Sequence, residues 1–482
     1  MSRAVCPLHA AAMRDPDAPV VIAASGERTT FAECDANASA VAAAFRSAGL
    51  EAGNRLALLG PFDVWSVPVL FGAFRAGDAV YLPNARLPRP ALLENLARAS
   101  CRCVVGPASA GDLPHWLSPG DLLAHPHRLA AAEVEPDAPA ILIATSGSTG
   151  EPKLAVLSLD NHLANAAASN RNIELLPGDR WLFSLPLYHV SGLGTLFRCM
   201  LAGAAMAAPA PGETLEDAIT RLNVTHLSVV ATQLQRLLNA PAGRRALRQL
   251  KAVLGGGGAI PADLIERAAD CNVALYTTYG LTETASQVTT TPPGATLDTL
   301  NTSGAPLSPG TVRVASDGEI QVRGRTLFLG YLQADGPLRR PVTADGWFPT
   351  NDLGRFDAAG NLVVTGRKDA MFVSGGENIH PEEIEAALCA LEDVERALVA
   401  PVPDADYGFR PLAFIEPAPG FAVDPASLRE RLAHTLPRYK LPVRFLPWPE
   451  DLAQTGIKPD RAFLRDLAAG FGDDQNARPD SG

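Results

Sequence analysis

Residues 140–153 read AILIATSGSTGEPK, an apolar run followed at once by a polar loop that ends in a lysine. The glycines let backbone N–H groups turn toward an anion, the Ser and Thr hydroxyls add donors, and the lysine adds positive charge. The stretch therefore predicts a buried strand that leads into a phosphate-binding loop, and an ordinary polar loop is the alternative that its composition leaves open. The candidate residues are Thr145, Ser146, Gly147, Ser148, Thr149, Gly150 and Lys153.

A Walker P-loop is excluded for this segment. That motif requires Gly-Lys-Ser/Thr at the start of a helix. Here Lys153 follows Pro152 and precedes Leu154. A phosphate-binding role for this loop therefore requires some other structural context.

Short apolar runs of the same kind recur at 55–59, 225–230 and 252–254, with Ala-, Leu- and Arg-rich segments between them. Apolar strands that alternate with helices indicate α/β layers and parallel sheets. From about residue 304 to 366 the pattern changes to short alternating segments, with turn residues at Asp317-Gly318 and Ala359-Gly-Asn361. This part should be an antiparallel sheet or a small β-barrel.

The chain has 482 residues, which indicates two or three domains. The segment 381–402 begins with a proline and reads as a helix followed by a strand. We therefore expect an α/β fold with a large N-terminal domain at 1–366, made of layered α/β subdomains and the small β-barrel at about 304–366. A small mobile α+β lid domain should follow at 367–471, and residues 472–482 should be a disordered tail.

Charge and composition exclude several classes of protein. The net charge is −11 and no long Lys/Arg run offsets it, which argues against a nucleic-acid partner. The N-terminus lacks the apolar core of a signal peptide, and the later apolar runs are too short for a membrane span, so we expect a cytoplasmic protein. The seven scattered cysteines should be reduced, and the Cys101-Arg-Cys103 pair lacks metal-site spacing.

Further motifs follow the loop along the chain. They are Gly255-Gly-Gly-Gly-Ala259, Tyr279-Gly-Leu-Thr-Glu283, Trp347-Phe-Pro-Thr-Asn-Asp352, Gly366-Arg-Lys-Asp369 and Gln454-Thr-Gly-Ile-Lys458. Each has a plain structural reading when it is taken alone: a loop, a core tyrosine, a surface turn or a solvated lysine. Together and in this order they resemble the adenylate-forming superfamily, which contains acyl- and aryl-CoA synthetases, nonribosomal adenylation domains and firefly luciferase. The resemblance covers nearly the whole chain.

The resemblance implies an enzyme that uses ATP, Mg²⁺ and a small-molecule carboxylic acid, and it assigns roles to the middle motifs. The segment Gly256, Gly257, Gly258, Ala259 would line the adenine pocket with Gly280, and Tyr279 would stack on the base. Thr282 would bind phosphate. Glu283 would hold Mg²⁺, a hard cation that favours carboxylate and phosphate oxygens.

The later motifs receive roles in the same way. Asp352 would accept hydrogen bonds from the ribose hydroxyls, and Asn351 stands where the family usually has glycine, which it can replace because Asn also accepts unusual backbone angles. Arg367 would contact ribose and phosphate, and Asp369 would be the hinge of the lid. The loop of Ser374, Gly375 and Gly376 would line the tunnel for the pantetheine of coenzyme A.

Lys458 is the candidate catalytic lysine. Family members commonly have Gly-Lys here, whereas this chain places Ile457 between the two residues. The charge of Lys458 would bridge the attacking carboxylate and the α-phosphate.

The segment 184–198, SLPLYHVSGLGTLFR, bears on which acid is activated. His189 fits the family's position at the acyl pocket. Arg198 lies among apolar residues in the sequence. Burial of its guanidinium would cost free energy unless an anion pairs with it. That anion is either an internal carboxylate or a carboxylate of the substrate.

Within the superfamily, four features together resemble the o-succinylbenzoate–CoA ligases of menaquinone biosynthesis. They are the segment 184–198, the segment 228–234, the stretch that begins with Ser374-Gly-Gly and the Gly-Ile-Lys sequence at Lys458. The substrate of these ligases has two carboxylates. One would be adenylated while Arg198 holds the other, with Ser228 and Thr232 as further pocket residues. The alternatives are a CoA ligase for another aryl or fatty acid and a non-catalytic nucleotide-binding homologue. A homodimer is compatible with the sequence.

Overall fold

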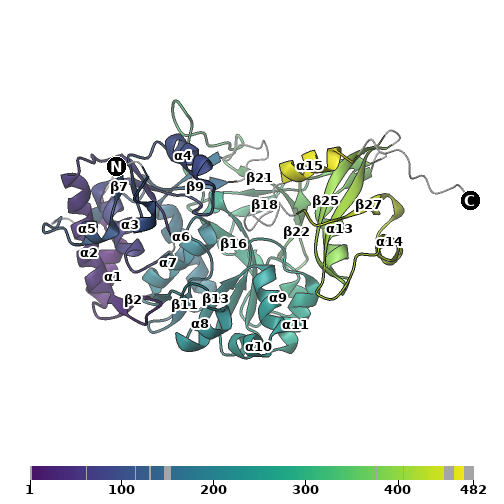
Figure 1. The fold of residues 1–482 in the computed structure, drawn as a ribbon, viewed down its shortest axis with the longest axis horizontal. Helices are drawn as coiled ribbons and strands as arrows, with labels where there is room; N and C mark the ends of the chain where they lie inside the picture. Colours follow the sequence, from purple (N-terminus) through teal and green to yellow (C-terminus); the bar gives the residue numbers. More distant parts are fainter. Residues whose placement is uncertain are drawn as a thin grey trace, which may run out of the picture.

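The computed structural model describes residues 3–60, 62–113, 115–129, 132–145, 153–374, 377–404, 407–449 and 461–471. It is a mixed α/β molecule in which a large N-terminal part carries a smaller C-terminal part at one end (Figure 1). The expected fold class is confirmed. The tail at 472–482 lies outside the described residues.

The first sheet is mostly parallel and contains the strand that leads to the predicted phosphate loop. Its strand order is β20-β10-β9-β5-β4-β6-β7, in which β9 lies parallel to β5 and antiparallel to β10. The strands are β4 (Arg55–Leu58), β5 (Ala79–Leu82), β6 (Cys103–Val105), β7 (Trp116–Leu117), β9 (Pro139–Thr145), β10 (Lys153–Ser158) and β20 (Gly330–Tyr331). A separate short pair joins β1 (Ala4–Val5) and β8 (Glu133–Val134).

The second sheet has the order β17-β16-β15-β14-β13-β11-β12-β2-β3. Its central strands are parallel, and β16 turns back antiparallel to β15. The strands are β2 (Pro19–Ile22), β3 (Arg28–Thr30), β11 (Arg180–Leu182), β12 (Ala205–Ala207), β13 (His226–Val229), β14 (Ala252–Gly255), β15 (Leu275–Leu281), β16 (Ser286–Thr290) and β17 (Ala305–Pro306).

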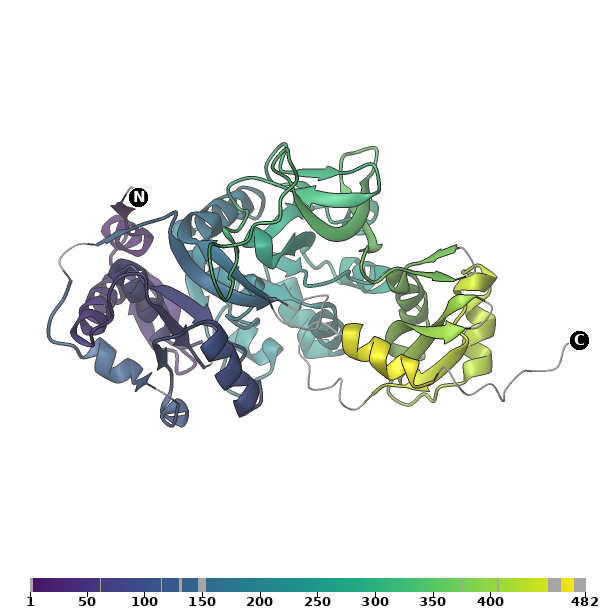
Figure 2. The ribbon, with the colours of Figure 1, turned by 90° about the horizontal axis from the view of Figure 1, so that it is seen from above.

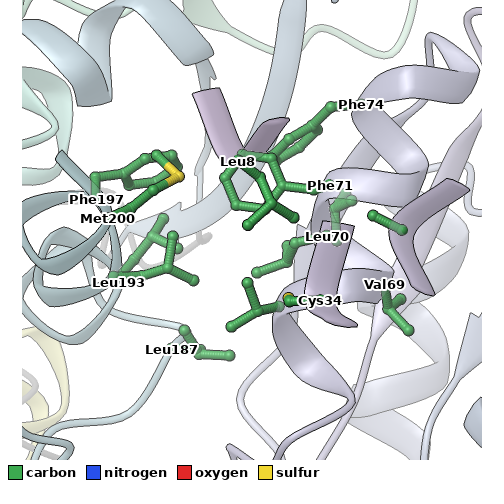
Figure 3. Packing of buried hydrophobic residues seen from close by; sticks show 14 of the residues in the cluster. Leu8, Cys34, Val69, Leu70, Phe71, Phe74, Leu187, Leu193, Phe197 and Met200 are labelled. Atoms are coloured by element: carbon green, nitrogen blue, oxygen red, sulfur yellow. The ribbon is translucent and has the colours of Figure 1, made fainter. Parts of the chain in front are cut away.

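Helices cover both sheets and fill the space between them. The main core joins residues of both sheets to the helices, and Figure 3 shows Phe197 and Met200 of one helix facing Leu8 and Phe71 of others. The helices are α1 (Pro7–Arg14), α2 (Phe31–Ser47), α3 (Ser66–Ala76), α4 (Arg89–Arg98), α5 (Pro119–Leu123), α6 (Leu159–Asn172), α7 (Val190–Ala202), α8 (Leu215–Arg221), α9 (Ala231–Asn239), α10 (Pro241–Arg248), α11 (Ala262–Asp270) and α12 (Leu297–Leu300).

The start of α6 shows how local sequence fixes these elements. Ser158 at its N-cap accepts a hydrogen bond from the backbone of Asn161, and the Asn161 side chain accepts one from the backbone of Ser158. This reciprocal cap satisfies two backbone donors that the helix itself leaves without partners.

The segment expected to be β-rich is an antiparallel sheet that curls into a half-barrel (Figure 2). Its strands are β18 (Val312–Val314), β19 (Glu319–Val322), β21 (Phe348–Phe356) and β22 (Leu362–Arg367). Asp317-Gly318 and the turn at 359–361 connect neighbouring strands, as their sequence predicts.

The C-terminal part packs helices on an antiparallel sheet to which one parallel strand is added. It contains β23 (Phe372–Ser374), β24 (Glu377–Ile379), β25 (Val394–Asp404), β26 (Gly408–Pro417), β27 (Arg444–Pro447), α13 (Pro381–Cys389), α14 (Pro425–Leu432) and α15 (Arg461–Ala469). The helix that starts at Pro381 and the strand after it are confirmed. Within the described part of the chain, no helix is long and apolar enough to cross a membrane.

Candidate active site

The predicted phosphate loop connects two paired strands. β9 ends at Thr145 and β10 begins at Lys153, and these two residues lie opposite each other in the antiparallel pair. The Thr145 hydroxyl donates to the backbone oxygen of Lys153 over 3.3 Å. The residues between them that the motif singles out, 146–150, lie outside the described residues, so the conformation of the loop stays a prediction.

Tyr331 links the lysine of this loop to the candidate magnesium ligand. The Lys153 ammonium lies 5.5 Å from the centre of the Tyr331 ring, and the Tyr331 hydroxyl donates to Glu283 Oε1 over 2.6 Å. Burial, followed by the nearby Glu283 charge, raises the pKa of Tyr331. The tyrosine therefore stays protonated and keeps donating.

None of the sequence motifs singles out Tyr331. It lies on β20, opposite Ala155 of β10, and the two positions are far apart along the chain. Pairing between these strands is what brings its ring to Lys153.

Glu283 lies in a short 3-10 helix, Thr282–Thr284, that follows directly after β15. Only 9% of its surface is exposed, so its carboxylate points into the protein toward Tyr331. A single carboxylate is a suitable Mg²⁺ ligand in nucleotide sites, because phosphate oxygens and water complete the coordination. The residue chemistry fits the expected metal.

Gly280 allows the close approach of the two strands that hold this motif. A Cβ atom at this position would lie 2.2 Å from the backbone oxygen of Ser286 on β16. Any larger residue would therefore push β15 and β16 apart.

Tyr279, Asp352 and Arg367 come from three separate motifs and form one hydrogen-bonded group. The Tyr279 hydroxyl donates to Asp352 Oδ2 over 2.6 Å, and Arg367 Nη1 donates to Asp352 Oδ1 over 2.9 Å. Arg367 also makes two 2.8 Å bonds to the carboxylate of Asp369, and these bonds raise its pKa. The candidate ribose acceptor and the candidate hinge are thus joined through a single guanidinium.

Asn351 adopts a left-handed conformation, with φ of 62°. This is one of the unusual backbone conformations that asparagine accepts, in agreement with the expectation that it can stand where the family usually has glycine. Its backbone oxygen accepts a hydrogen bond from the backbone N–H of Lys368 over 2.7 Å, which ties β21 to the residue before the candidate hinge Asp369.

The glycine-rich segment lies beside the strand that carries Tyr279. It follows β14, which pairs with β15, and a Cβ atom on Gly256 would lie 2.9 Å from the Thr278 side chain. Gly257 has φ of 81°, where glycine is favoured. The two predicted parts of the adenine pocket are therefore adjacent.

Arg198 is on α7 and is only 1% exposed. Its Nη2 donates to the Ser286 hydroxyl over 3.0 Å, and its guanidinium carbon lies 5.3 Å from the centre of the Trp181 ring. Its Nε and Nη1 are buried without a partner among the described residues, and no carboxylate of that part pairs with it. Burial lowers the pKa of Arg198 to about 10, which still leaves it charged at neutral pH.

The other acyl-pocket candidates differ in their surroundings. His189 caps the start of α7, next to the Tyr188 ring. Ser228 is buried and its hydroxyl accepts a hydrogen bond from the Trp181 indole over 3.1 Å. Thr232 is exposed on the first turn of α9.

Part of the predicted lid chemistry lies outside the described residues. This applies to Gly375, Gly376 and the catalytic candidate Lys458. Ser374, before the two glycines, ends β23 with its hydroxyl buried and without a partner in the described part of the chain.

Two family models match the chain. The model described as AMP-binding enzyme matches residues 8–332, and the model of the AMP-binding enzyme C-terminal domain matches residues 383–457. Together they cover most of the chain, and the resemblance seen in its motifs is confirmed.

Curated relatives point in the same direction. The chain is 34% identical over 452 residues to 2-succinylbenzoate–CoA ligase from Escherichia coli, covering 93% of this chain and 95% of that protein. It is 33% identical over 442 residues to the enzyme of the same name from Geobacillus kaustophilus, covering 88% and 90%.

Solved structures share the whole fold. The o-succinylbenzoate CoA synthetase (MenE) of Bacillus subtilis in complex with the acyl-adenylate intermediate OSB-AMP has a TM-score of 0.87 and 26% identity, with 100% of both chains covered. The same enzyme in complex with ATP and magnesium ion has a TM-score of 0.86 and 27% identity, covering 96% of this chain and 100% of that one. The chain belongs to the AMP-binding enzyme family, as an AMP-forming acid–CoA ligase.

Proposed function

We propose that this protein converts o-succinylbenzoate, ATP and coenzyme A into o-succinylbenzoyl-CoA, AMP and pyrophosphate. Relatives named 2-succinylbenzoate–CoA ligase match this chain over nearly their whole length. Similar structures hold ATP with magnesium or the OSB-AMP adenylate. The observation in this chain that carries the substrate assignment is Arg198, a buried cation with no carboxylate partner among the described residues.

The first partial reaction makes the acid reactive. A carboxylate is a poor acyl donor because oxide would have to leave, so its oxygen attacks the α-phosphate of ATP and pyrophosphate departs. Lys153 and Lys458 would offset the negative charge that develops, since fixed cations act most strongly where charge builds in the transition state. Glu283 would hold Mg²⁺, which would supply further charge neutralisation.

The nucleotide would be oriented by the group built around Asp352. Its carboxylate is held by Tyr279 and Arg367, and a ribose would meet a preorganised acceptor. Preorganisation of this kind lowers the barrier because the groups need not reorient during the reaction.

In the second partial reaction the thiol of coenzyme A attacks the acyl carbon and AMP leaves. We propose that the domain at 367–471 turns about Asp369 between the two steps and brings the loop of Ser374, Gly375 and Gly376 to the thiol. Lid rotation of this kind allows one site to serve two reactions in succession. The proposed boundary with the domain at 1–366 falls between Gly366 and Arg367.

The negative charge of the second carboxylate of o-succinylbenzoate would offset the free-energy cost of burying the Arg198 guanidinium. An ionised side chain in such a place needs a counter-charge, and the described residues supply only a hydroxyl and an aromatic ring. His189 and Thr232 would lie nearer the rest of the acyl group.

A panel of acids tests this proposal. With ATP, Mg²⁺ and coenzyme A, o-succinylbenzoate should exceed benzoate in kcat/KM by about 100-fold, since a hydrogen-bonded charge pair contributes roughly 1.5–3 kcal/mol. Arg198→Met should remove most of this preference and leave the KM for ATP unchanged. If benzoate or a medium-chain fatty acid has the higher kcat/KM, the substrate assignment is wrong.

Two finer features are also proposed. They are a homodimer, which light scattering on the purified protein would detect, and a cytoplasmic location, which cell fractionation would detect. The non-catalytic alternative predicts no release of pyrophosphate from acid and ATP.

A further inference from the structure

The hydroxyl of Ser228 is already engaged inside the protein. Ser228 is 4% exposed on β13, and its Oγ accepts the indole N–H of Trp181 over 3.1 Å. Trp181 lies on the neighbouring strand β11 and is fully buried. An indole N–H in such a position needs an acceptor, and Ser228 supplies it.

Trp181 in turn forms one wall around the guanidinium of Arg198. The guanidinium carbon lies 5.3 Å from the ring centre, within the range of a cation–π interaction. The ring also lies beside His226, at 5.2 Å between centroids, which limits its freedom on another side. Rotation of the indole is therefore restricted by its neighbour and by its hydrogen bond.

β16 and α7 also contribute to the surroundings of the Arg198 guanidinium. Nη2 donates to the Ser286 hydroxyl over 3.0 Å. A Cβ atom on Gly194, one helical turn earlier, would lie 3.2 Å from Nη2 and 3.4 Å from that hydroxyl. The glycine leaves the space in which the guanidinium and the serine meet.

We propose that Ser228 is a positioning residue that acts on the substrate through Trp181 and Arg198, and that it does not contact the acid itself. The inference rests on the proposed function, in which Arg198 binds the second carboxylate. Ser228 orients the indole, the indole and Ser286 hold the guanidinium plane, and a guanidinium donor that has no partner among the described residues is then left to bind the carboxylate. Donors held in one plane lose less freedom on binding.

Two variants break the same link from opposite ends. Ser228→Ala removes the acceptor, and Trp181→Phe removes the donor while it keeps an aromatic ring beside Arg198. Each should raise the KM for o-succinylbenzoate about fivefold with little change in kcat, because the lost orientation affects binding of the ground and transition states equally. The double variant should show no more than the larger single effect, since both changes remove one interaction.

Direct contact between Ser228 and the acid would give a different pattern. Ser228→Ala would then raise the KM while Trp181→Phe left it near the parent value, and the effects would add in the double variant. That result overturns the inference. An equal rise in the KM for benzoate, which lacks the second carboxylate, also overturns it.

Ser228→Thr serves as the matched control, since it keeps a hydroxyl that can accept the indole N–H and should restore the parent KM. The KM for ATP and the thermal unfolding midpoint show whether each variant is folded. A parent enzyme without preference for o-succinylbenzoate over benzoate overturns the proposed function and this inference with it. A parent with that preference, whose KM the variants leave unchanged, overturns only the role of Ser228.

Discussion

At the residue scale, Tyr331 connects two candidate residues of the nucleotide site. It donates over 2.6 Å to Glu283, the candidate ligand of Mg²⁺, while its ring faces Lys153. A hydrogen bond to a carboxylate fixes the orientation of that carboxylate, and residues behind a metal ligand tune how well it binds.

Replacing Tyr331 with Phe should therefore weaken the response to magnesium. The ring next to Lys153 stays, whereas Glu283 loses its donor. We expect the Mg²⁺ concentration for half-maximal adenylation to rise about tenfold, as loss of a partner behind a metal ligand commonly costs about 10–100-fold. The rate of pyrophosphate release, measured over a range of Mg²⁺ concentrations, gives this half-maximal concentration. A variant that needs no more Mg²⁺ than the parent contradicts the role of Tyr331.

His162 is a second residue whose environment has a measurable consequence. It is 1% exposed, it stacks on Phe197 at 4.8 Å, and both ring nitrogens are buried without a partner in the described part of the chain. Burial lowers the pKa of His162 from 6.5 to about 3, so the folded protein holds it neutral.

The sign of the pH effect follows from this lowered pKa. Below pH 6.5 the His162 side chain binds a proton in the unfolded chain but stays neutral in the folded chain. The unfolding free energy that this residue contributes at neutral pH is therefore lost as the pH falls. His162→Phe should remove about 1.4 kcal/mol per pH unit from the acid-side slope of the unfolding free energy. Denaturant unfolding between about pH 4.5 and 7 measures that slope, with His127→Asn as a control at an exposed site. An unchanged slope in His162→Phe would contradict the assignment.

At the scale of single elements, the hairpin of β21 and β22 carries part of the nucleotide site. Asp352 and Arg367 lie opposite each other in this pair, and Asn351 next to them has φ of 62°. Directly after this left-handed residue, the Asp352 carboxylate accepts hydrogen bonds from both Tyr279 and Arg367. Local conformation and site geometry are therefore coupled here.

Two substitutions at Asn351 separate conformation from side-chain chemistry. Asn351→Ala should lower the unfolding free energy by about 1–2 kcal/mol, because alanine bears the steric cost of the left-handed region. Asn351→Gly should stay within about 1 kcal/mol of the parent, since glycine adopts the conformation without that cost. The Asn351 side chain is exposed, so lost contacts should contribute little. Equal stability of the Ala variant and the parent, in denaturant unfolding, would rule out strain at this position.

For the molecule as a whole, the proposed hinge lies just after β22. Arg367 clamps Asp369 through two 2.8 Å bonds, and Gln235 of α9 donates to Glu395 of β25 over 3.1 Å. Among the described residues, the polar contact between Gln235 and Glu395 joins the C-terminal part to the large part, and the core of the C-terminal part is separate from the main core of the large part. Such an arrangement suits a domain that turns as a unit.

A proline at the proposed hinge tests rotation. Asp369→Pro fixes φ near about −65°, so it should preserve one partial reaction and slow the other by about 100-fold. Asp369→Ala loses the same clamp to Arg367 but leaves the backbone free, and it should support both reactions. Adenylate formation and thiolysis of supplied adenylate are measured separately. If proline and alanine slow both steps equally, position 369 is not the hinge.

The sequence by itself determines a good deal about this protein. Short-range features need only neighbouring residues: the strand before Thr145, the hairpin turn at Asp317-Gly318 and the helix from Pro381 follow from local backbone preferences. The order of the motifs carries the family resemblance, and this resemblance predicts the adenylation chemistry. Candidate residues from three motifs, Tyr279, Asp352 and Arg367, form hydrogen bonds with one another in the structure.

Only the tertiary structure decided which partner each side chain finds. Tyr331 reaches Glu283 because β20 pairs with β10, and Ser228 engages Trp181 because β13 lies beside β11. For Arg198 the sequence left an internal carboxylate and a substrate carboxylate equally open, and the fold surrounds it with a serine and a tryptophan. Sequence patterns specify which residues turn inward, whereas strand pairing between distant segments sets which inward residues touch.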